Sequence, residues 1–255
     1  MIEKLGVQTF TVRNEIKTPD DIRKTFTRLN DIGYKRFELA RMKYNQAELN
    51  VLKELKKEFD FEYVTCQIKM KTIIKNFDWL MKFSIELGIP TIEVSVIPIS
   101  DFLKREKGMI ELSGKLNELG QRTKKAGINL LFHHHNFELI KMGGKLGIDH
   151  LFENTDREFV NFVVDTYWLA RSGFDPFSFV KKHEDRVKGI HLRDSEMFQK
   201  GFGFDYKDQV IGKGTINFDP FKNEILNNVD FYSVEQNSSD PIEDLKSGYN
   251  YLSHL

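Results

Sequence analysis

The alternation of eight short β-rich runs with longer helical segments constrains the fold of this 255-residue chain more than any other feature. Each run is rich in Val, Ile, Phe, Tyr or Thr and is short enough for one strand. In chain order, the strand candidates are KLGVQTFTV, KRFELA, FEYVTCQIKM, TIEVSVIPI, NLLFHHH, NFVVDTYW, VKGIHLRD and FYSVEQN. Eight strand–helix units in this length predict an α/β fold, namely a (β/α)₈ TIM barrel forming a single domain over residues 1–255.

The segments between these runs carry helix signals. Helical periodicity covers four of them, residues 19–32, 46–59, 72–87 and 115–126. Thr18 before Pro19 is typical of a helix N-cap followed by a proline in the first turn. The helix after the sixth strand is short, and residues 195–217 look irregular. No strand candidate is followed by G-x-G-x-x-G, which argues against a dinucleotide-binding open sheet.

Composition narrows the classes of function. Lys+Arg and Asp+Glu number 38 each, so the chain lacks the basic excess of a non-specific nucleic-acid binder. A single cysteine, Cys66, excludes an intramolecular disulfide and a thiolate zinc cluster. The N-terminus MIEKLGVQTF has no signal-peptide pattern, and no stretch approaches ~18 uninterrupted apolar residues. We therefore expect a cytoplasmic protein with no nucleic-acid and no membrane partner.

Polar side chains stand at the predicted carboxyl ends of the strands, where the active site of a TIM barrel forms. In chain order these are Gln8, Glu38, Gln67 with Lys69, His133 with His134 and His135, Asp165, His191, and Glu235 with Gln236. Four of these ends offer an imidazole, a carboxylate, an imidazole and a carboxylate. Because they lie around half of one barrel mouth, these four strand ends could converge on a single divalent metal ion. Mixed nitrogen and oxygen ligands suit Mn²⁺, Co²⁺, Zn²⁺ or Fe²⁺.

Each of these signals alone has a plainer interpretation. Asp165 could cap the following helix, and His191 could be a core histidine with satisfied hydrogen bonds. Strand alternation places His133 and His135 on one face of the fifth strand and His134 on the other. If His133 faces the barrel axis, His134 packs among the helices, and one inward imidazole can bind the metal while the other meets substrate. The alternative is a strand end decorated with polar groups.

Three further residues are candidates for substrate binding. Trp168, with Tyr167, could form an aromatic wall for a sugar ring, although core packing is the alternative. Ile211 to Phe218, IGKGTINF, reads as a flexible loop over the mouth, where Lys213 could meet an anionic group; a surface turn is the alternative. Gln8, at the end of the first strand, is the third candidate.

Several motifs in the right order resemble those of the xylose isomerase-like barrels, the sugar phosphate isomerase/epimerase-type proteins. LFHHHNFEL resembles Y-H-N-H-x-F-E-F, and VVDTYWLARSGFDP is similar to D-x-x-W-x-x-x-x-G-x-D-P. IHLRD resembles H-L-K-D, IGKGTINF resembles G-x-G-x-(I/L)-(D/N)-F, and VEQN resembles (V/I)-E-Q-D. The similarity runs from LGVQTFTVR to the last helix, and so covers nearly the whole chain.

The resemblance implies that His133, Asp165, His191 and Glu235 bind the metal and that Arg193 contacts substrate. One departure concerns the fifth strand, where the epimerases of this family carry a glutamate that is both ligand and acid/base group. This chain has His133 there, so their two-glutamate proton shuttle does not carry over intact. Inosose dehydratases also have histidines in this region, which keeps dehydration open.

The expected activity is divalent-metal-dependent isomerisation or epimerisation of a small keto-sugar, polyol or sugar derivative in carbohydrate metabolism. It would proceed by α-proton abstraction and a metal-stabilised enediolate. Glu235 is the best candidate base, and His135 or Glu38 could be the second acid/base group. The alternatives are an inosose dehydratase-like lyase, an endonuclease IV-like repair nuclease, for which the ligand set looks too small, and a non-catalytic sugar-binding relic. Because such barrels often associate, a homo-oligomer is a further expectation.

Overall fold

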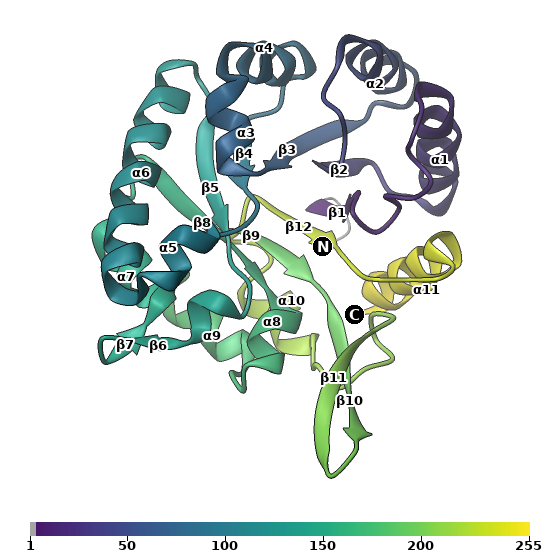
Figure 1. Ribbon diagram of the computed structural model, residues 1–255. Coiled ribbons are helices and arrows are strands. Elements are labelled where there is room, and N and C mark those ends of the chain that lie inside the picture. Colours follow the sequence, from purple (N-terminus) through teal and green to yellow (C-terminus); the bar gives the residue numbers. More distant parts are fainter. Residues whose placement is uncertain (1–3) are drawn as a thin grey trace.

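The computed structural model, which describes residues 4–255, is a closed barrel of eight parallel strands surrounded by helices (Figure 1). Each barrel strand pairs with the barrel strands before and after it in the chain, and the last pairs with the first. The barrel strands are β1 (Leu5–Gln8), β2 (Arg36–Ala40), β3 (Glu62–Ile68), β4 (Thr91–Val94), β5 (Asn129–His133), β8 (Val160–Asp165), β9 (Val187–Leu192) and β12 (Phe231–Val234). The (β/α)₈ prediction is confirmed.

Helices cover the outside of the barrel, and others lie within the loops at its mouth (Figure 1). They are α1 (Pro19–Ile32), α2 (Gln46–Phe59), α3 (Met70–Lys75), α4 (Phe77–Leu87), α5 (Ile99–Leu103), α6 (Arg105–Lys125), α7 (Gly147–Asn154), α8 (Thr166–Arg171), α9 (Pro176–Lys182), α10 (Asp219–Glu224) and α11 (Pro241–His254), with a 3₁₀ turn, η2, at Phe137–Leu139. Among the helices in residues 4–255, none is long and apolar enough to cross a membrane.

Helix ends follow the local sequence. At the start of α1, the Thr18 hydroxyl accepts from the Asp21 backbone N–H and the Asp21 carboxylate accepts from the Thr18 N–H, a reciprocal capping box. α1 and α2 have the predicted bounds. The predicted helix over 72–87 is instead two helices, because the chain leaves helical geometry at Asn76 (φ −117°, ψ 31°) between α3 and α4. The predicted 115–126 segment is the second half of the longer helix α6.

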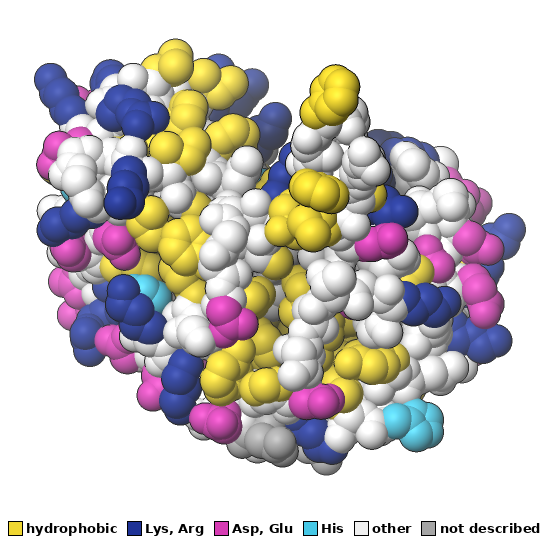
Figure 2. Space-filling model, turned by 90° about the horizontal axis from the view of Figure 1, so that it is seen from below, with side chains coloured by type: hydrophobic (Ala, Val, Ile, Leu, Met, Phe, Trp, Pro, Cys, Tyr) yellow, Lys and Arg dark blue, Asp and Glu magenta, His cyan; other side chains and the backbone are white. Residues whose placement is uncertain are grey.

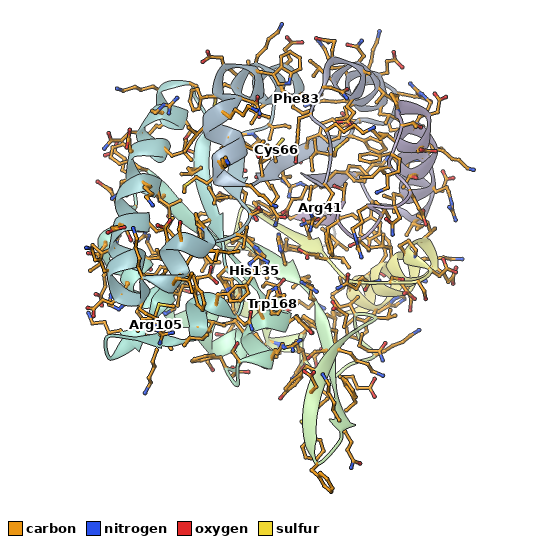
Figure 3. The ribbon with its side chains drawn as sticks, in the orientation of Figure 1. Arg41, Cys66, Phe83, Arg105, His135 and Trp168 are labelled. Atoms are coloured by element: carbon orange, nitrogen blue, oxygen red, sulfur yellow. The ribbon has the colours of Figure 1, made fainter. Side chains whose placement is uncertain are left out.

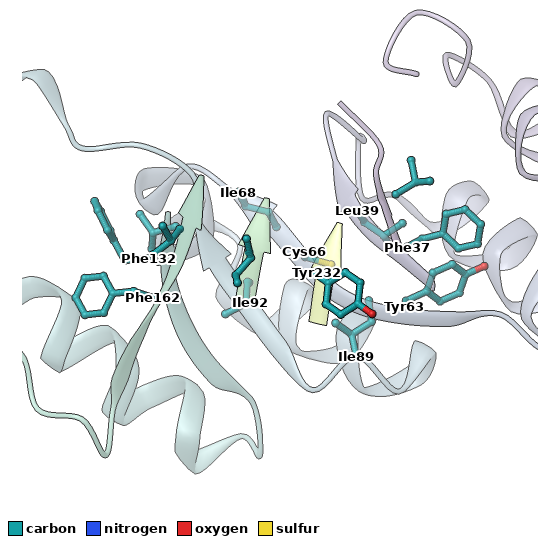
Figure 4. Close-up of a cluster of buried hydrophobic side chains, with 14 of the residues drawn as sticks. Phe37, Leu39, Tyr63, Cys66, Ile68, Ile89, Ile92, Phe132, Phe162 and Tyr232 are labelled. Carbon is teal, nitrogen blue, oxygen red and sulfur yellow. The ribbon is translucent and has the colours of Figure 1, made fainter. Parts of the chain in front are cut away.

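Two separate apolar layers flank the strands. The larger lies between strands and helices, and Figure 4 shows part of it, including Phe37, Tyr63 and Phe162. The smaller lies inside the barrel and consists of Val64, Leu131, Val163 and Phe231, all at most 2% exposed. Because strand side chains alternate, the residues two positions after Leu131 and Val163 and four positions after Phe231 also point inward, nearer the mouth. The interior packing of β5, β8 and β12 therefore sets where the polar strand ends lie.

The region 195–217, predicted to be irregular, contains a regular antiparallel hairpin, β10 (Asp194–Lys200) and β11 (Gly203–Gln209). Figure 1 shows it extending away from the barrel, and in Figure 2 apolar side chains mark its tip, where Phe202 and Phe204 are highly exposed. A second, shorter hairpin, β6 (Lys141–Met142) and β7 (Lys145–Leu146), precedes α7.

The loop of residues 211–218, which follows the β10–β11 hairpin and was predicted to be flexible, is held in place by the buried carboxylate of Asp194. This carboxylate accepts backbone N–H groups from Gly212 (3.0 Å), Gly214 (2.9 Å) and Ile216 (3.1 Å). Gly214 is required by this approach, because a Cβ there would lie 2.2 Å from Asp194 Oδ1. The loop is therefore anchored to the end of β9.

Gly108 on α6 gives a stability prediction. A Cβ at Gly108 would lie 1.8 Å from the Asp101 carbonyl oxygen of α5, whereas Gly114, exposed on the same helix, has nothing within 4 Å. Gly108→Ala is expected to lower the free energy of unfolding by about 2–3 kcal/mol through overpacking. Gly114→Ala, the matched control, should raise it by about 0.5–1 kcal/mol. Urea denaturation checks both, and equal effects would contradict the close packing of α5 on α6.

Candidate active site

The four predicted metal ligands converge at the carboxyl ends of β5, β8, β9 and β12. One ligand atom from each of His133, Asp165, His191 and Glu235 lies within 4.8 Å of the others, and all four residues are buried. His133 Nε2 is 3.7 Å from Asp165 Oδ2, and His191 Nδ1 is 2.9 Å from Glu235 Oε2. They come from strands separated by 26 to 44 residues along the chain, so their meeting follows from barrel closure.

The hydrogen bonds of this group suit a bound cation. Within residues 4–255, both ring nitrogens of His133 are buried without a hydrogen-bond partner. An unpaired buried polar atom is costly, and in native proteins it usually has an identifiable function. Two imidazoles and two carboxylates are also the donor types that mixed nitrogen and oxygen metal sites use. The residues present therefore fit a divalent metal ion.

Arg193, at the end of β9, lies against the carboxylates of this group. Its Nη1 is 3.2 Å from Asp165 Oδ2 and 3.1 Å from Glu235 Oε1, and its Nη2 is 2.6 Å from Asp208 Oδ1 on β11. Burial alone would raise the pKa of Asp165 and of Glu235, but the charge of Arg193, together with the neighbouring histidines, more than reverses it. The pKa of Asp165 falls below its ordinary range, and that of Glu235 falls to about 2. Both carboxylates are therefore ionised and available to a cation.

Beneath this group, a network of buried polar side chains holds His191. The Glu38 carboxylate accepts from His191 Nε2 through both oxygens, at 2.9 and 3.0 Å. Burial lowers the pKa of His191, but the charges of Glu38 and Glu235 more than reverse this and raise it well above its usual value. The two hydrogen bonds from Glu38 orient the His191 ring, so that Nδ1 points at the other ligands. Because a metal ion must displace the proton on Nδ1, the affinity of the site for the metal should weaken as the pH falls.

Sequence reasoning missed Glu93, at the end of β4. Its carboxylate accepts from Gln67 Nε2 (2.9 Å), and with Glu38 and His191 it forms a second group of closely spaced potential metal ligands that shares His191 with the first. Burial, followed by the charge of Glu38, raises the pKa of Glu93 well above the usual value. The single acidic residue within the apolar run TIEV was the signal that could have identified it.

A cavity of about 430 Å³ opens above the ligands. His135 and Trp168 line it, with ring centroids 5.3 Å apart, and Figure 3 shows them together at the mouth. Arg193 and Glu235 also reach it. Two predicted substrate contacts, Gln8 and Lys213, do not line this cavity: Gln8 is buried and donates to Glu235 Oε2 (3.1 Å), and Lys213 is exposed on the anchored loop.

The three consecutive histidines have three different surroundings. His133 belongs to the ligand group, whereas His134 is buried near Phe179 of α9 and accepts the Asp165 backbone N–H at Nε2 (3.2 Å). Its Nδ1 then carries the proton and donates to the His135 carbonyl (2.9 Å). Burial, and then the nearby His133, lower the pKa of His134 to about 4 and that of His135 to about 3. Both are therefore neutral at pH 7.

Glu138 makes stability depend on pH. It is fully buried, its Oε2 accepts the His135 backbone N–H (2.8 Å), and burial raises its pKa to about 7. Since an unfolded glutamate titrates near ~4.3, the folded protein holds a proton that the unfolded chain has released, and stability falls as the pH rises from about 4.3 to about 7. Glu138→Gln should remove this loss and be more stable than wild type at pH 8 by about 3 kcal/mol.

Urea denaturation from pH 5 to pH 8 measures this effect. Glu158→Gln is the control, because Glu158 is an exposed partner of Lys124 and should leave the profile of the wild type unchanged. Parallel profiles for the wild type and Glu138→Gln would contradict the raised pKa.

Comparisons with known proteins agree with this architecture. A family model described as xylose isomerase-like TIM barrel matches residues 26–254. An inosose dehydratase from Clostridium perfringens is 31% identical over 158 residues, which are 56% of this chain and 52% of that protein. The chain thus spans about half the length of that curated relative, and less of several others.

Solved structures share the fold at low sequence identity. A sugar phosphate isomerase/epimerase from Parabacteroides distasonis superposes with a TM-score of 0.77 at 19% identity, over 97% of this chain and 92% of that one. The IOLI protein, solved with a bound zinc atom, superposes with a TM-score of 0.71 at 16% identity, over 98% of this chain and 96% of that one.

Proposed function

Because this chain belongs to the xylose isomerase-like TIM barrel family, we propose that it is a divalent-metal-dependent isomerase or epimerase of a small keto-sugar or polyol derivative. The observation that carries the proposal is the convergence of His133, Asp165, His191 and Glu235 beneath a cavity of about 430 Å³. The unpartnered nitrogens of His133 support a metal at this point, as does the zinc atom of the IOLI structure.

The reaction would begin with removal of the proton next to a substrate carbonyl. A bound divalent ion would polarise that carbonyl and stabilise the negative charge that develops as the proton leaves. Glu235 is ionised and borders the cavity, so it is the candidate base. His135 is neutral and faces the same cavity, so its position makes it the candidate for the second acid/base group.

Other side chains would position the reacting groups. Arg193 keeps Asp165 and Glu235 ionised, and Glu38 holds the His191 ring through two hydrogen bonds. Trp168, packed edge-on to Tyr167, gives the cavity a rigid apolar wall that suits the face of a sugar ring. Glu38 has both oxygens on His191 and does not line the cavity, so His135 is the better placed second acid/base group.

Dehydration is the second candidate, favoured by the curated relatives, which are inosose dehydratases. It shares the first step, since a hydroxyl on the adjacent carbon can depart after the α-proton is removed. His133 also stands where the epimerases that this chain resembles have a glutamate. A single base, Glu235, suffices for elimination if it returns the abstracted proton to the hydroxyl, which leaves as water, whereas epimerisation needs a second group to return a proton to carbon.

The test combines metal analysis with proton exchange. Gently purified protein should contain about one equivalent of a divalent metal. Incubation with keto-sugars and inosose-like compounds in D₂O with added Mn²⁺ should then incorporate deuterium at the α-carbon, followed by NMR. Loss of water from an inosose would select the dehydratase, and retention of all carbon-bound oxygens would select the isomerase. Protein that binds no metal and exchanges no proton would overturn the proposal.

A further inference from the structure

One side of the cavity carries positive side chains that form no ion pair with a carboxylate within residues 4–255. Arg41, after β2, and Lys69, after β3, line the cavity, and neither side chain forms a hydrogen bond or an ion pair with the rest of residues 4–255. Among the residues that the structure describes, Arg13, after β1, donates to neutral acceptors alone, the Phe10 carbonyl (2.8 Å) and Asn237 Oδ1 (3.0 Å). Elsewhere on the surface, many cations do pair with a carboxylate, as Arg23 and Lys53 do.

Two of these cations lie close together. The guanidinium carbons of Arg13 and Arg41 are 3.9 Å and 5.3 Å from the centre of the same Phe10 ring. Burial, and then the charge of Arg41, lower the pKa of Arg13. Two positive groups that share one ring repel each other, and a bound anion would relieve that repulsion.

The backbone of Arg41 is held in a conformation that is unfavourable for an arginine. Its φ of 60° lies in the left-handed region, which residues other than glycine avoid. The turn is fixed on both sides: Thr9 Oγ1 bonds both backbone groups of Ala40, and the Glu48 carboxylate accepts the backbone N–H groups of Lys43 and Tyr44. Strained residues that their surroundings fix in this way cluster at ligand sites. Figure 3 shows Arg41 at the mouth, across from His135 and Trp168.

We propose that the substrate carries a carboxylate or a phosphate group, and that Arg41 and Lys69, backed by Arg13, bind it. This inference rests on the proposed function, because it names the substrate class of the same site. Glu235, the candidate base, would take the carbonyl end of the substrate at the floor of the cavity, whereas the unpaired cations attract the anionic group to the rim. The substrate is therefore oriented, with its carbonyl towards Glu235 and its anionic group towards Arg41.

The experiment measures binding by calorimetry at low ionic strength with three matched probes, D-fructose, D-fructose 6-phosphate and D-fructuronate. Metal-free protein in a chelator is used alongside the metal-loaded form, so that anion recognition is read without catalysis. One of the charged probes should bind at least about tenfold more tightly than fructose. Arg41→Gln and Lys69→Gln should each reduce that preference several-fold, and the double variant should abolish it. Fructose should bind all variants alike.

Arg105→Gln is the matched control. Arg105 also has a left-handed backbone (φ 57°), but its guanidinium donates to the Lys141 carbonyl (2.7 Å) and it does not line the cavity. Figure 3 places it at the edge of the molecule, so this variant should keep the full preference. Stronger binding of the phosphate or of the carboxylate identifies which anion the rim takes, and either supports the proposal.

Equal binding of the three probes would overturn the inference, and so would a preference that survives in the double variant. The two proposals fail differently. Fast deuterium exchange on neutral sugars, with no anion preference, would leave the function standing and remove the charged substrate class. Anion binding that depends on Arg41 in a protein without metal or exchange would remove the proposed reaction.

Discussion

Glutamine in place of Glu235 is expected to abolish stoichiometric metal binding and to slow α-proton exchange by about 10³-fold or more. Glu235 Oε2 lies 2.9 Å from His191 Nδ1, and its carboxylate borders the cavity, so one side chain serves as candidate ligand and candidate base. Glutamine keeps the size, and its single amide oxygen can accept from either Gln8 or Arg193, but it lacks the charge and basicity. Elemental analysis of the purified variant and NMR in D₂O measure the two effects.

Two control variants separate this result from general damage. Glu158→Gln removes an exposed carboxylate and should retain metal and exchange. Glu38→Gln removes the negative charge that pairs with His191 Nε2 without touching the cavity, and should weaken metal affinity by about 10- to 100-fold while leaving exchange measurable at saturating metal. A Glu235→Gln protein that keeps both metal and exchange would remove Glu235 from both roles.

The barrel could be predicted because its main determinant is local. Each strand buries both faces, so it reads as an apolar run, and each helix repeats its apolar positions at helical spacing. The hairpin β10–β11 was missed for the opposite reason: most of its residues are exposed or half-buried, so it lacks the apolar alternation that marks a strand. The break at Asn76 was missed because the apolar period continues from α3 into α4.

For the site, the sequence indicated which polar side chains stand at the ends of the strands, but not which of them form hydrogen bonds with one another in the fold. Four ligand candidates stood at such ends, and barrel closure brings them together. The Glu38–His191 hydrogen bond joins residues 153 positions apart, and no local pattern encodes it. The register also shifts between Phe37 and Glu38, where β2 pairs with β3, so alternation counted along β3 does not carry over to its neighbour. The Arg41 side chain has no ion-pair partner within residues 4–255, and a sequence does not show which charged side chains lack a partner in the fold.

The adjacent residues His133 and His134 are expected to respond to alanine substitution in opposite ways. His133→Ala should weaken metal affinity by at least about 100-fold, because it removes one of four ligands, and should change the stability of the metal-free protein by less than about 1 kcal/mol. Neither nitrogen of His133 is hydrogen-bonded to another described residue, and the space that the ring leaves adjoins the cavity, where water can enter.

His134→Ala should instead lower the free energy of unfolding by about 2–3 kcal/mol, because it leaves the Asp165 N–H and the His135 carbonyl without partners in a buried site. The metal affinity of this variant should stay within about tenfold of wild type, since both nitrogens of the His134 ring are hydrogen-bonded to backbone groups and the ring supplies no ligand. Competition with a chromophoric chelator and urea denaturation of the metal-free proteins give the two readouts. If His134→Ala lost the metal and kept its stability, His134 rather than His133 would be the ligand. The side chains of β5 that point into the barrel would then have to be shifted by one residue. That shift is incompatible with Leu131, two positions before His133, packing inside the barrel, so the two measurements also test the register that places the whole site.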